Sequence, residues 1–473
     1  MSYETVIGLE IHAQLLTESK MFCSCRTSFG SEPNTHICPV CTGQPGALPV
    51  VNASAVEFAV RAGLATSCRI NNTSIFARKN YFYPDLPKGY QISQHDKPLC
   101  EHGFINVPNG GRISITRIHM EEDAGKFLHE TGNAETSHVD YNRSSIPLIE
   151  IVSGPDMRSP ATAIAYLKAL RNILMYLEIC NGNMQEGSFR VDANISIMPK
   201  GSDKFGTRTE LKNMNSFRAI ERALNFEIGR QTKVLEGGGK VIQETLLWND
   251  GKGVTESMRS KEEAHDYRYF PEPDLPPLII TDEWIEMVKK GIPELAEAKA
   301  ARFVKDLGIP EYDANVLTQD KALADYYEET IKNFNSPKKI SNWIMTELLR
   351  EIKNGEADLS ECKIKPQALA KLVEMVETGA ISGKIGKTVF EEMHASGRKP
   401  EEVIKEKGLA QVSDTSAIEK IIDEVLANNA GSVAKYRSGK AGLFGFFVGE
   451  TMKATKGRAN PKVVNEILKR KLG

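Results

Sequence analysis

The 473-residue chain contains no run of about 18 consecutive apolar residues, the length that a membrane-spanning helix needs. Its N-terminus lacks the basic stretch followed by an apolar stretch that is typical of a secretory signal peptide. Cysteine is scarce outside one cluster: four of the eight cysteines lie together, unlike the dense framework of a small secreted domain. We therefore expect a soluble, cytoplasmic protein with no membrane segment.

An excess of one charge is also missing. The formal net charge is -2, so the chain as a whole is not a basic nucleic-acid coat, and any nucleic-acid-binding surface must be local. The sequence shows no internal repeat and no low-complexity segment. Its length suggests about three domains, each long enough to bury a core.

Common nucleotide-binding and nucleophile motifs are absent. The chain has neither a G-x-G-x-x-G fingerprint nor a G-x-S-x-G elbow. Gly386-Lys387-Thr388 looks like the end of a phosphate loop, but Ile381 stands where that motif requires glycine, and no apolar strand precedes it. We interpret this segment as a loop between helices. If the protein uses ATP, a less common fold must bind it.

The segment from Thr5 to Leu15 is the clearest structural signal in the chain. Apolar and polar residues alternate through it, which predicts a strand with one buried face. Glu10 and His12 lie on the polar face, about 7 Å apart along the strand. The apolar face consists of Ile7, Leu9, Ile11, Ala13 and Leu15.

The character of the sequence changes twice. Residues 1–290 mix strand and helix patterns and end in a proline-rich stretch at 270–278, and residues 76–98 read as an aromatic, proline-punctuated loop. Beyond 290 the strand signals disappear. We therefore expect an α+β protein, with a β-rich domain and flanking helices over 1–290, an all-α domain over 291–405 and a small, basic all-α domain over 406–473. The expected helices lie at about 53–66, from 159–160 onward, and at 217–235, 294–307, 322–333, 340–353, 366–377 and 416–427.

Several other strand-like segments carry acidic residues among apolar ones. Burial of a carboxylate on a sheet face is costly unless the group is paired or binds a cation. Oxygen ligands with one imidazole suit Mg2+ or Mn2+, and Mg2+ with open positions commonly accompanies ATP phosphates. The alternative is ordinary ion pairing with Arg78, Lys79, Arg117, Arg143 and Arg190. The acidic residues concerned are Glu121, Glu122, Asp123, Glu150, Asp192 and Glu210, the last with Lys212 on the same face.

The cysteine cluster consists of two close pairs, Cys23-x-Cys25 and Cys38-Pro-x-Cys41. Four thiolates match the tetrahedral ligand set of a structural Zn2+, although the first pair has a shorter spacer than usual. The alternative is four reduced cysteines without a metal. A zinc ion there would hold a long loop and leave no open position for a reaction.

The C-terminal segment from Gly431 carries ten Lys or Arg residues against two Glu. Such a local excess of positive charge, with interleaved aromatic residues, favours contact with a nucleic-acid backbone. The alternative is that the lysines only form a solvated surface. We expect the phenylalanines to fill the core of this small domain and the Lys and Arg residues to contact nucleic acid. The residues expected to contact nucleic acid are Lys435, Arg437, Lys440, Lys453, Lys456 and Arg458.

Several blocks together resemble one family, the B subunits of the bacterial tRNA-dependent amidotransferases. The resemblance covers essentially the whole chain in order. It rests on the blocks VIGLEIHAQL, RKNYFYPDLPKGYQISQ, HMEEDAGK, PLIEIVS, EGSFRVDANIS, ELKNMNSF, DYRYFPEPDLPPL and GFFVGETMKATKGRANP.

The resemblance implies a reaction and partners. It implies a ligase that uses ATP and glutamine, in a heterotrimer with an amidase subunit and a small third subunit. The substrate would be misacylated Glu-tRNA(Gln) or Asp-tRNA(Asn), whose side-chain carboxylate is phosphorylated and then amidated by ammonia from the amidase. The family's first domain is a β-rich cradle that holds the active site, and its helical and tail domains contact tRNA.

Matched residue by residue, the resemblance also implies roles within the first domain. A Mg2+ site would comprise Glu10, His12, Glu122 and Glu150, with Asp192 and Glu210 behind it. His12, Glu122 and Lys79 would be the catalytic residues, Lys79 contacting phosphate or helping ammonia delivery. Two other hypotheses are a non-catalytic tRNA-binding scaffold, which would lack ATP-dependent phosphorylation, and a metal-dependent hydrolase, which would act without ATP.

Overall fold

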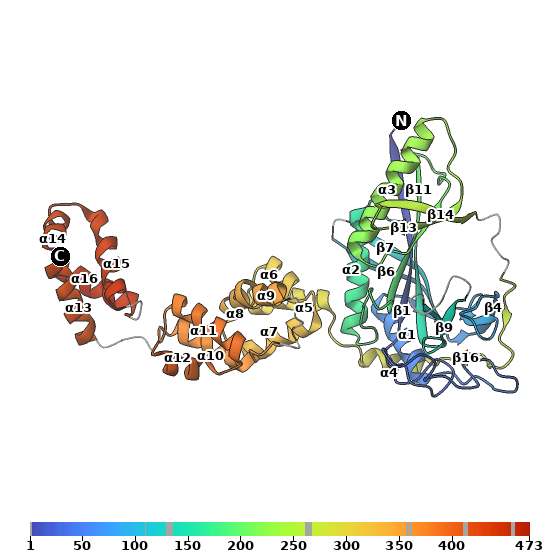
Figure 1. Cartoon of the computed structure of the whole chain (residues 1–473), viewed down its shortest axis with the longest axis horizontal. Coiled ribbons are helices and arrows are strands. Elements are labelled where there is room, and N and C mark those ends of the chain that lie inside the picture. The colour runs from blue at the N-terminus through green and yellow to red at the C-terminus, as the bar shows by residue number, and fades with distance from the viewer. Residues whose placement is uncertain are drawn as a thin grey trace. The chain divides into compact units, whose positions relative to one another are not determined.

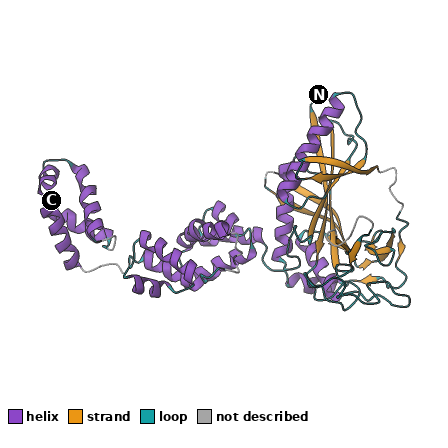
Figure 2. Cartoon of the chain, in the orientation of Figure 1, coloured by secondary structure: helices purple, strands orange, loops and turns teal. Residues whose placement is uncertain are grey.

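The computed structural model describes residues 2–108, 110–128, 136–260, 267–355, 359, 362–409, 415–455 and 459–473. The chain forms two compact units, Met1–Leu295 and Ala296–Gly473. Among the described residues, the first unit contains all the named strands together with four helices, and the second is helical, so the expected α+β class is confirmed at this level (Figure 2). None of the helices within the described residues is long and apolar enough to cross a membrane.

A nine-stranded sheet forms the centre of the first unit, in the order β14-β13-β12-β11-β1-β10-β7-β6-β2 (Figure 1). All neighbours pair antiparallel except β12 and β13. The expected strand at Thr5–Leu15 is confirmed as the central strand β1. The strands of this sheet are β1 Tyr3–Gln14, β2 Arg69–Ile70, β6 Cys100–Val107, β7 Gly111–Glu122, β10 Pro147–Ser153, β11 Phe189–Pro199, β12 Thr209–Lys212, β13 Glu244–Asn249 and β14 Val254–Ser260.

Smaller sheets and four helices complete this unit. The small sheets comprise β4 Phe76–Asn80, β5 Tyr90–Gln94 and β15 Phe270–Pro271, then β3 Thr73–Ser74 with β16 Leu278–Ile279, and β8 Lys126–Leu128 with β9 His138–Asp140. The helices are α1 Ala53–Ala65, α2 Pro160–Tyr176, α3 Phe217–Glu236 and α4 Asp282–Lys290.

The interpretation of residues 76–98 as a loop is wrong for Phe76–Asn80 and Tyr90–Gln94, which form the strands β4 and β5. β4 pairs antiparallel with β5, and only 81–89 connects them without regular structure. Tertiary contacts hold β5 in place, because the Ile92 N–H donates to the Glu122 carboxylate and the Gln91 side chain donates to the Glu122 carbonyl. The prolines and tyrosines of the connection obscure the strand pattern, and contacts with the distant β15 and Glu122 support the two strands.

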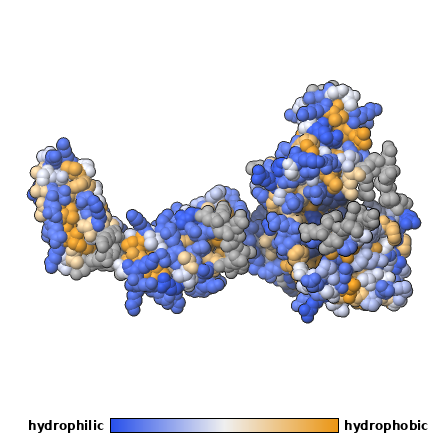
Figure 3. Space-filling view, viewed as in Figure 1, coloured by the Kyte–Doolittle hydropathy of each residue, from blue (hydrophilic) through white to orange (hydrophobic). Residues whose placement is uncertain are grey.

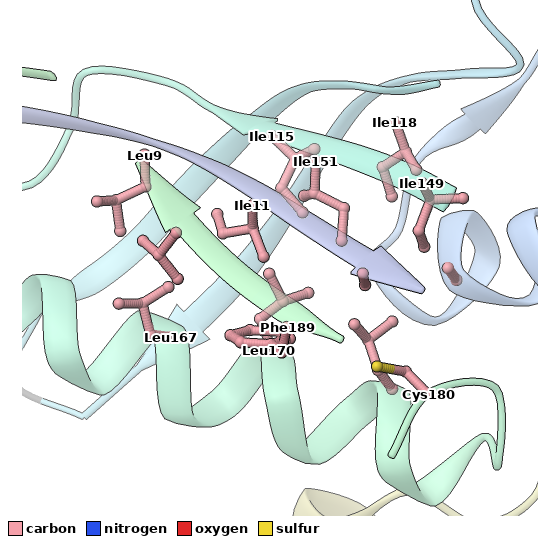
Figure 4. Packing of buried hydrophobic residues seen from close by; sticks show 14 of the residues in the cluster. Leu9, Ile11, Ile115, Ile118, Ile149, Ile151, Leu167, Leu170, Cys180 and Phe189 are labelled. Atoms are coloured by element: carbon pink, nitrogen blue, oxygen red, sulfur yellow. The ribbon is translucent and has the colours of Figure 1, made fainter. Parts of the chain in front are cut away.

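One face of the large sheet is apolar and packs against helices. Leu9 and Ile11 of β1 lie beside Ile149 and Ile151 of β10 over the α2 helix (Figure 4). The expected helix starts are confirmed: the Asn52 side chain accepts hydrogen bonds from two N–H groups at the start of α1, and the Ser159 hydroxyl caps α2. This packing fixes which side chains of each strand point to the opposite, polar face.

The second unit contains two separate hydrophobic clusters, one within residues 300–404 and one within 418–472. Gly386 lies inside α11 rather than in the expected loop, since the Ser382 hydroxyl caps that helix by accepting from the Ile385 N–H. The helices are α5 Ala296–Leu307, α6 Glu311–Leu317, α7 Lys321–Asn333, α8 Pro337–Trp343, α9 Leu349–Gly355, α10 Pro366–Glu377, α11 Gly383–Ser396, α12 Pro400–Lys407, α13 Thr415–Asn428, α14 Ala430–Arg437, α15 Phe444–Ala454 and α16 Pro461–Leu472. A π-helical segment, Ile344–Leu348, joins α8 to α9.

Candidate active site and its relatives

The polar face of the large sheet carries a row of charged and imidazole side chains. His12 lies opposite Arg190 of β11 on one side and opposite Glu150 of β10 on the other. Glu150 in turn lies opposite His119 of β7. The row therefore crosses four adjacent strands, β11, β1, β10 and β7, whose sequences are far apart in the chain.

Three of the side chains converge closely enough to hold one metal ion. The His12 Nε2 lies 3.4 Å from a carboxylate oxygen of Glu121 and 3.4 Å from one of Glu150. Ligand atoms from these three residues lie within 4.8 Å of one another. One imidazole with two carboxylates is a donor set that suits Mg2+ or Mn2+, and we refer to these three residues as the acidic cluster.

His119 lies beside the acidic cluster and was missed by the sequence analysis. Its Nε2 is 3.3 Å from Glu150 and 3.8 Å from Glu121. Burial alone would lower the pKa of His119, but these two carboxylates raise it to about 9. In the same way burial would raise the pKa of Glu150, but both histidines hold it well below its usual range. The lowered pKa favours the ionised form of Glu150, which metal binding requires.

Glu122 was expected at this site, but the structure places it on the opposite side of β7. Its carboxylate pairs with Lys88 and accepts a hydrogen bond from the Ile92 N–H at 2.9 Å. The alternation of β7 explains the difference, because Ile118 and Met120 face the core and Glu122 has their phase. The same alternation points to Glu121 and His119, so this signal was present in the sequence.

The other expected residues form a second group next to the acidic cluster. Glu10 lies opposite Asp192 in the sheet and accepts a hydrogen bond from Asn194 at 2.9 Å. Burial raises the pKa of Glu10, with the charges of Glu150 and Glu210 acting in the same direction. The Lys212 ammonium pairs with Asp192 and lies 3.2 Å from Glu210. Ion pairing with Lys212 is therefore sufficient to explain the charges of Asp192 and Glu210 on this face. Glu10 differs from them, because its pKa is raised.

A cavity of about 420 Å³ borders two members of the acidic cluster, His12 and Glu121. Asp123, on its wall, accepts two hydrogen bonds from the Arg190 guanidinium at 2.9 and 3.0 Å. Burial would raise the pKa of Asp123, but Arg190 and Arg143 lower it to about 2. The lining residues are His12, Lys79, Tyr81, Asp85, Gln91, Glu121, Asp123, Ala124, Arg143, Leu148, Arg190, Asp192 and Lys212.

Lys79 reaches this cavity from β4. Its Nζ lies 4.9 Å from the centre of the Tyr267 ring. Burial would lower the pKa of Lys79, but the charge of Glu121 and other neighbouring groups raise it. The lysine is therefore held as a cation among aromatic rings and carboxylates, as a group that contacts an anionic substrate would be.

A larger cavity of about 630 Å³ lies further along the same sheet face. Glu10 and Asn194 border it, so it adjoins the residues next to the acidic cluster. Its wall offers one exposed ring, Phe205, and the polar side chains of Arg208 and Gln243. A flat apolar group with polar edges would fit such a lining.

The four clustered cysteines also converge. The sulfur atoms of Cys23, Cys25, Cys38 and Cys41 lie within 4.8 Å of one another, and none of these four is in a disulfide. The pKa of the Cys41 thiol is lowered to about 5, chiefly by a hydrogen bond from Cys23. This group, the cysteine cluster, could hold a metal ion with four sulfur ligands, as Zn2+ prefers.

Two family models match the chain: the GatB/GatE catalytic domain over residues 5–286 and the GatB domain over residues 325–472. Full-length relatives are also similar. The B subunit of the aspartyl/glutamyl-tRNA(Asn/Gln) amidotransferase of Geobacter sp. (strain M21) is 59% identical over 477 residues, covering 100% of both chains. The chain belongs to this amidotransferase B-subunit family. The proteins of the same name from Thermoanaerobacter pseudethanolicus (strain ATCC 33223 / 39E) and Myxococcus xanthus (strain DK1622) are 55% and 56% identical, covering 100% of this chain and 100% and 99% of theirs.

The basic residues expected in the tail of this family member are only partly described. Lys435, Arg437, Lys440 and Lys453 are exposed, whereas Lys456 and Arg458 lie outside the described residues. Phe447 is buried in the hydrophobic cluster of this segment, as expected, but Phe446 is exposed. On the face seen in Figure 3, hydrophilic side chains predominate and hydrophobic patches are scattered among them.

Proposed function

We propose that this chain is the catalytic B subunit of a glutamine-dependent amidotransferase. It converts Glu-tRNA(Gln), Asp-tRNA(Asn) or both to the corresponding amides, using ATP and ammonia. The observation that carries this proposal is the convergence of His12, Glu121 and Glu150 under a cavity with cationic side chains on its walls. Family membership supports the same reaction, because the relatives carry the amidotransferase name.

The chemistry explains why cations and acids occur together. A carboxylate resists attack by ammonia at neutral pH, so it must first receive a phosphoryl group that can leave. Transfer of that group from ATP brings several anions together, and their repulsion must be offset. A Mg2+ held by His12, Glu121 and Glu150 would supply this charge compensation when bound. Lys79 and Arg190 would hold the anionic groups from the cavity wall.

We assign the nucleoside part of ATP to the larger cavity. Phe205 would contact the adenine ring, and Arg208 and Gln243 would hold its polar edges or the ribose. The cavity borders Glu10, and Glu10 is adjacent to the acidic cluster, so phosphates could extend from one cavity toward the other. Asp192 and Glu210 would act indirectly, by holding Lys212.

Ammonia must arrive as NH3, because NH4+ has no free electron pair. Its attack releases a proton, and Glu10 is suited to accept it, since burial and neighbouring charges raise the pKa of this carboxyl. Lys79 remains protonated and would repel NH4+ while its aromatic neighbours exclude water.

The proposal includes partners and a structural metal. An amidase subunit would supply ammonia, and a small third subunit would complete a heterotrimer. Misacylated tRNA would contact exposed basic residues such as Lys435 and Arg437. The cysteine cluster would hold Zn2+ and stabilise its loop without taking part in the reaction.

The test is a reconstituted complex carrying His12→Ala. With each misacylated tRNA, ATP and glutamine, we expect amide formation to fall at least about 100-fold while glutamine hydrolysis continues. Wild-type rates of amide formation would refute the assignment. Retained tRNA binding in a wild-type complex that produces no ATP-dependent phosphorylation would instead favour the scaffold hypothesis.

A further inference from the structure

Lys20 is fully buried next to the cysteine cluster, with 0% of the residue exposed. The Lys20 N–H donates to the Cys25 carbonyl at 2.9 Å, so the residue begins the same turn that carries the first cysteine pair. Its Nζ lies 3.7 Å from the Cys41 sulfur and 3.1 Å from the Tyr141 carbonyl oxygen. The side chain therefore ends between a possible metal ligand and a backbone dipole.

The ammonium group of Lys20 has no carboxylate partner among the described residues. Within that part of the chain, the polar atoms in contact with it are the Cys41 sulfur and the Tyr141 carbonyl oxygen. Two other lysines with little-exposed side chains are compensated differently: Lys88 pairs with Glu122, and Lys299 lies 2.6 Å from Glu328. A buried ammonium group without a counter-charge is strongly destabilising.

The charge state of the cysteine cluster supplies the missing counter-charge. Four thiolates around one divalent ion carry a formal excess of two negative charges. The Lys20 ammonium group, 3.7 Å from one of these sulfur atoms, is placed to complement that excess. The ammonium group lies close to the Cys41 sulfur, and Cys41 is the buried one of the four cysteines.

We propose that Lys20 is the electrostatic partner of the metal-loaded cysteine cluster and that it favours retention of the metal ion. This inference rests on the proposed zinc site. Lys20 is a positioning residue, because it acts through the thiolates and touches no substrate. Its second partner, the Tyr141 carbonyl, connects the loaded cluster to the segment that carries Arg143 on the cavity wall.

The first measurement is the release of zinc from the full chain to an excess of chelator. We expect Lys20→Met, which preserves length and apolar volume, to release zinc about tenfold faster than the wild type, as loss of an outer partner of metal ligands does. Lys299→Met is the matched control, since it removes a buried lysine from the other unit, and its zinc release should be unchanged.

The second measurement separates charge from packing. Thermal unfolding is compared for the wild type and Lys20→Met, each with and without zinc. Removal of an electrostatic partner should destabilise the loaded chain more than the empty one, whereas loss of mere packing would destabilise both equally. If the empty chain does not fold, the release rates decide. A wild type that binds no zinc would overturn both this inference and the zinc site; normal zinc content with equal release rates would overturn the inference alone.

Discussion

The acidic cluster and the cysteine cluster belong to the same unit but offer a metal ion different surroundings. His12, Glu121 and Glu150 contribute nitrogen and oxygen ligands from three strands, and His12 and Glu121 border a cavity. The four cysteines contribute sulfur from one loop segment and complete a tetrahedral set by themselves. A metal in the first cluster would keep positions for substrate, whereas one in the second would be closed. Under the proposed function, the acidic cluster would take part in the reaction and the cysteine cluster would stabilise its loop.

The strongest test of this difference between the two clusters is to neutralise one ligand of the acidic cluster. In a reconstituted complex, we expect Glu150→Gln to lower kcat for amide formation by at least about 100-fold, with glutamine hydrolysis retained. Glu101→Gln on β6 is the matched control, because Glu101 forms an ion pair with Arg69 near the surface. Surface pairs contribute little, about 1 kcal/mol or less, so this control should stay near wild-type activity. Equal rates of amide formation for the two variants would show that the acidic cluster takes no part in the reaction.

The opposite pattern is expected for the cysteine cluster. Replacing Cys38 and Cys41 together by serine should remove about one zinc ion per chain and lower the midpoint of thermal unfolding by at least about 5 °C. Elemental analysis and calorimetry measure the two effects. Cys362→Ser, a buried cysteine outside the cluster, should leave the zinc content unchanged. Loss of amide formation without loss of stability would contradict the assignment of this cluster to structure.

His119, which lies beside the acidic cluster, should also make the free energy of unfolding depend on pH in the absence of Mg2+. The pKa of His119 is raised from 6.5 to about 9, so protonated His119 stabilises the folded state fully below about pH 6.5. That contribution is lost as the pH rises from 6.5 through 9, with a slope of up to about 1.4 kcal/mol per pH unit. Urea unfolding at several pH values should show a shallower decline for His119→Gln than for the wild type. The same decline in both would mean that another group titrates.

Much of the fold follows from local patterns in the sequence. The alternation in Thr5–Gln14 predicts both the strand and its buried residues, since a period of two leaves only one face for the core. Capping by Asn52 and Ser159 similarly predicts where two helices begin. These features depend on neighbours in sequence, and the structure confirms them.

The acidic cluster was only partly predictable because it depends on register. His12 and Glu150 are opposite each other only because β1 and β10 pair as they do, and no local pattern sets that pairing. In contrast, the sequence predicts which side chains of β7 face the core. Ile118 and Met120 face it, and the alternation of the strand then places Glu121 and not Glu122 on the polar face. Family resemblance led to Glu122, whereas the period of the strand indicates Glu121, the glutamate that lies beside His12 and Glu150 in the structure.

Neither cluster accounts for the proposed contact with tRNA, and the basic tail provides the last and smallest expected effect. Deleting the tail would also remove Phe447 and Ile467 from its core, so substitution of surface residues is the cleaner test. Changing the exposed Lys435, Arg437 and Lys440 to glutamine should weaken tRNA binding. The slope of log K against log salt should also fall, by about one for each phosphate that is no longer neutralised.

The matched control for the tail changes three exposed lysines of the first unit to glutamine, namely Lys240, Lys289 and Lys290. The control removes the same amount of positive charge, so it separates a local binding surface from a general effect of net charge. Binding measured over a range of salt concentrations should then show a smaller slope for the tail variant than for the control. Identical salt slopes for the wild type and the tail variant would mean that the tail charges are only solvated, and the surface that binds tRNA would have to lie elsewhere in the chain.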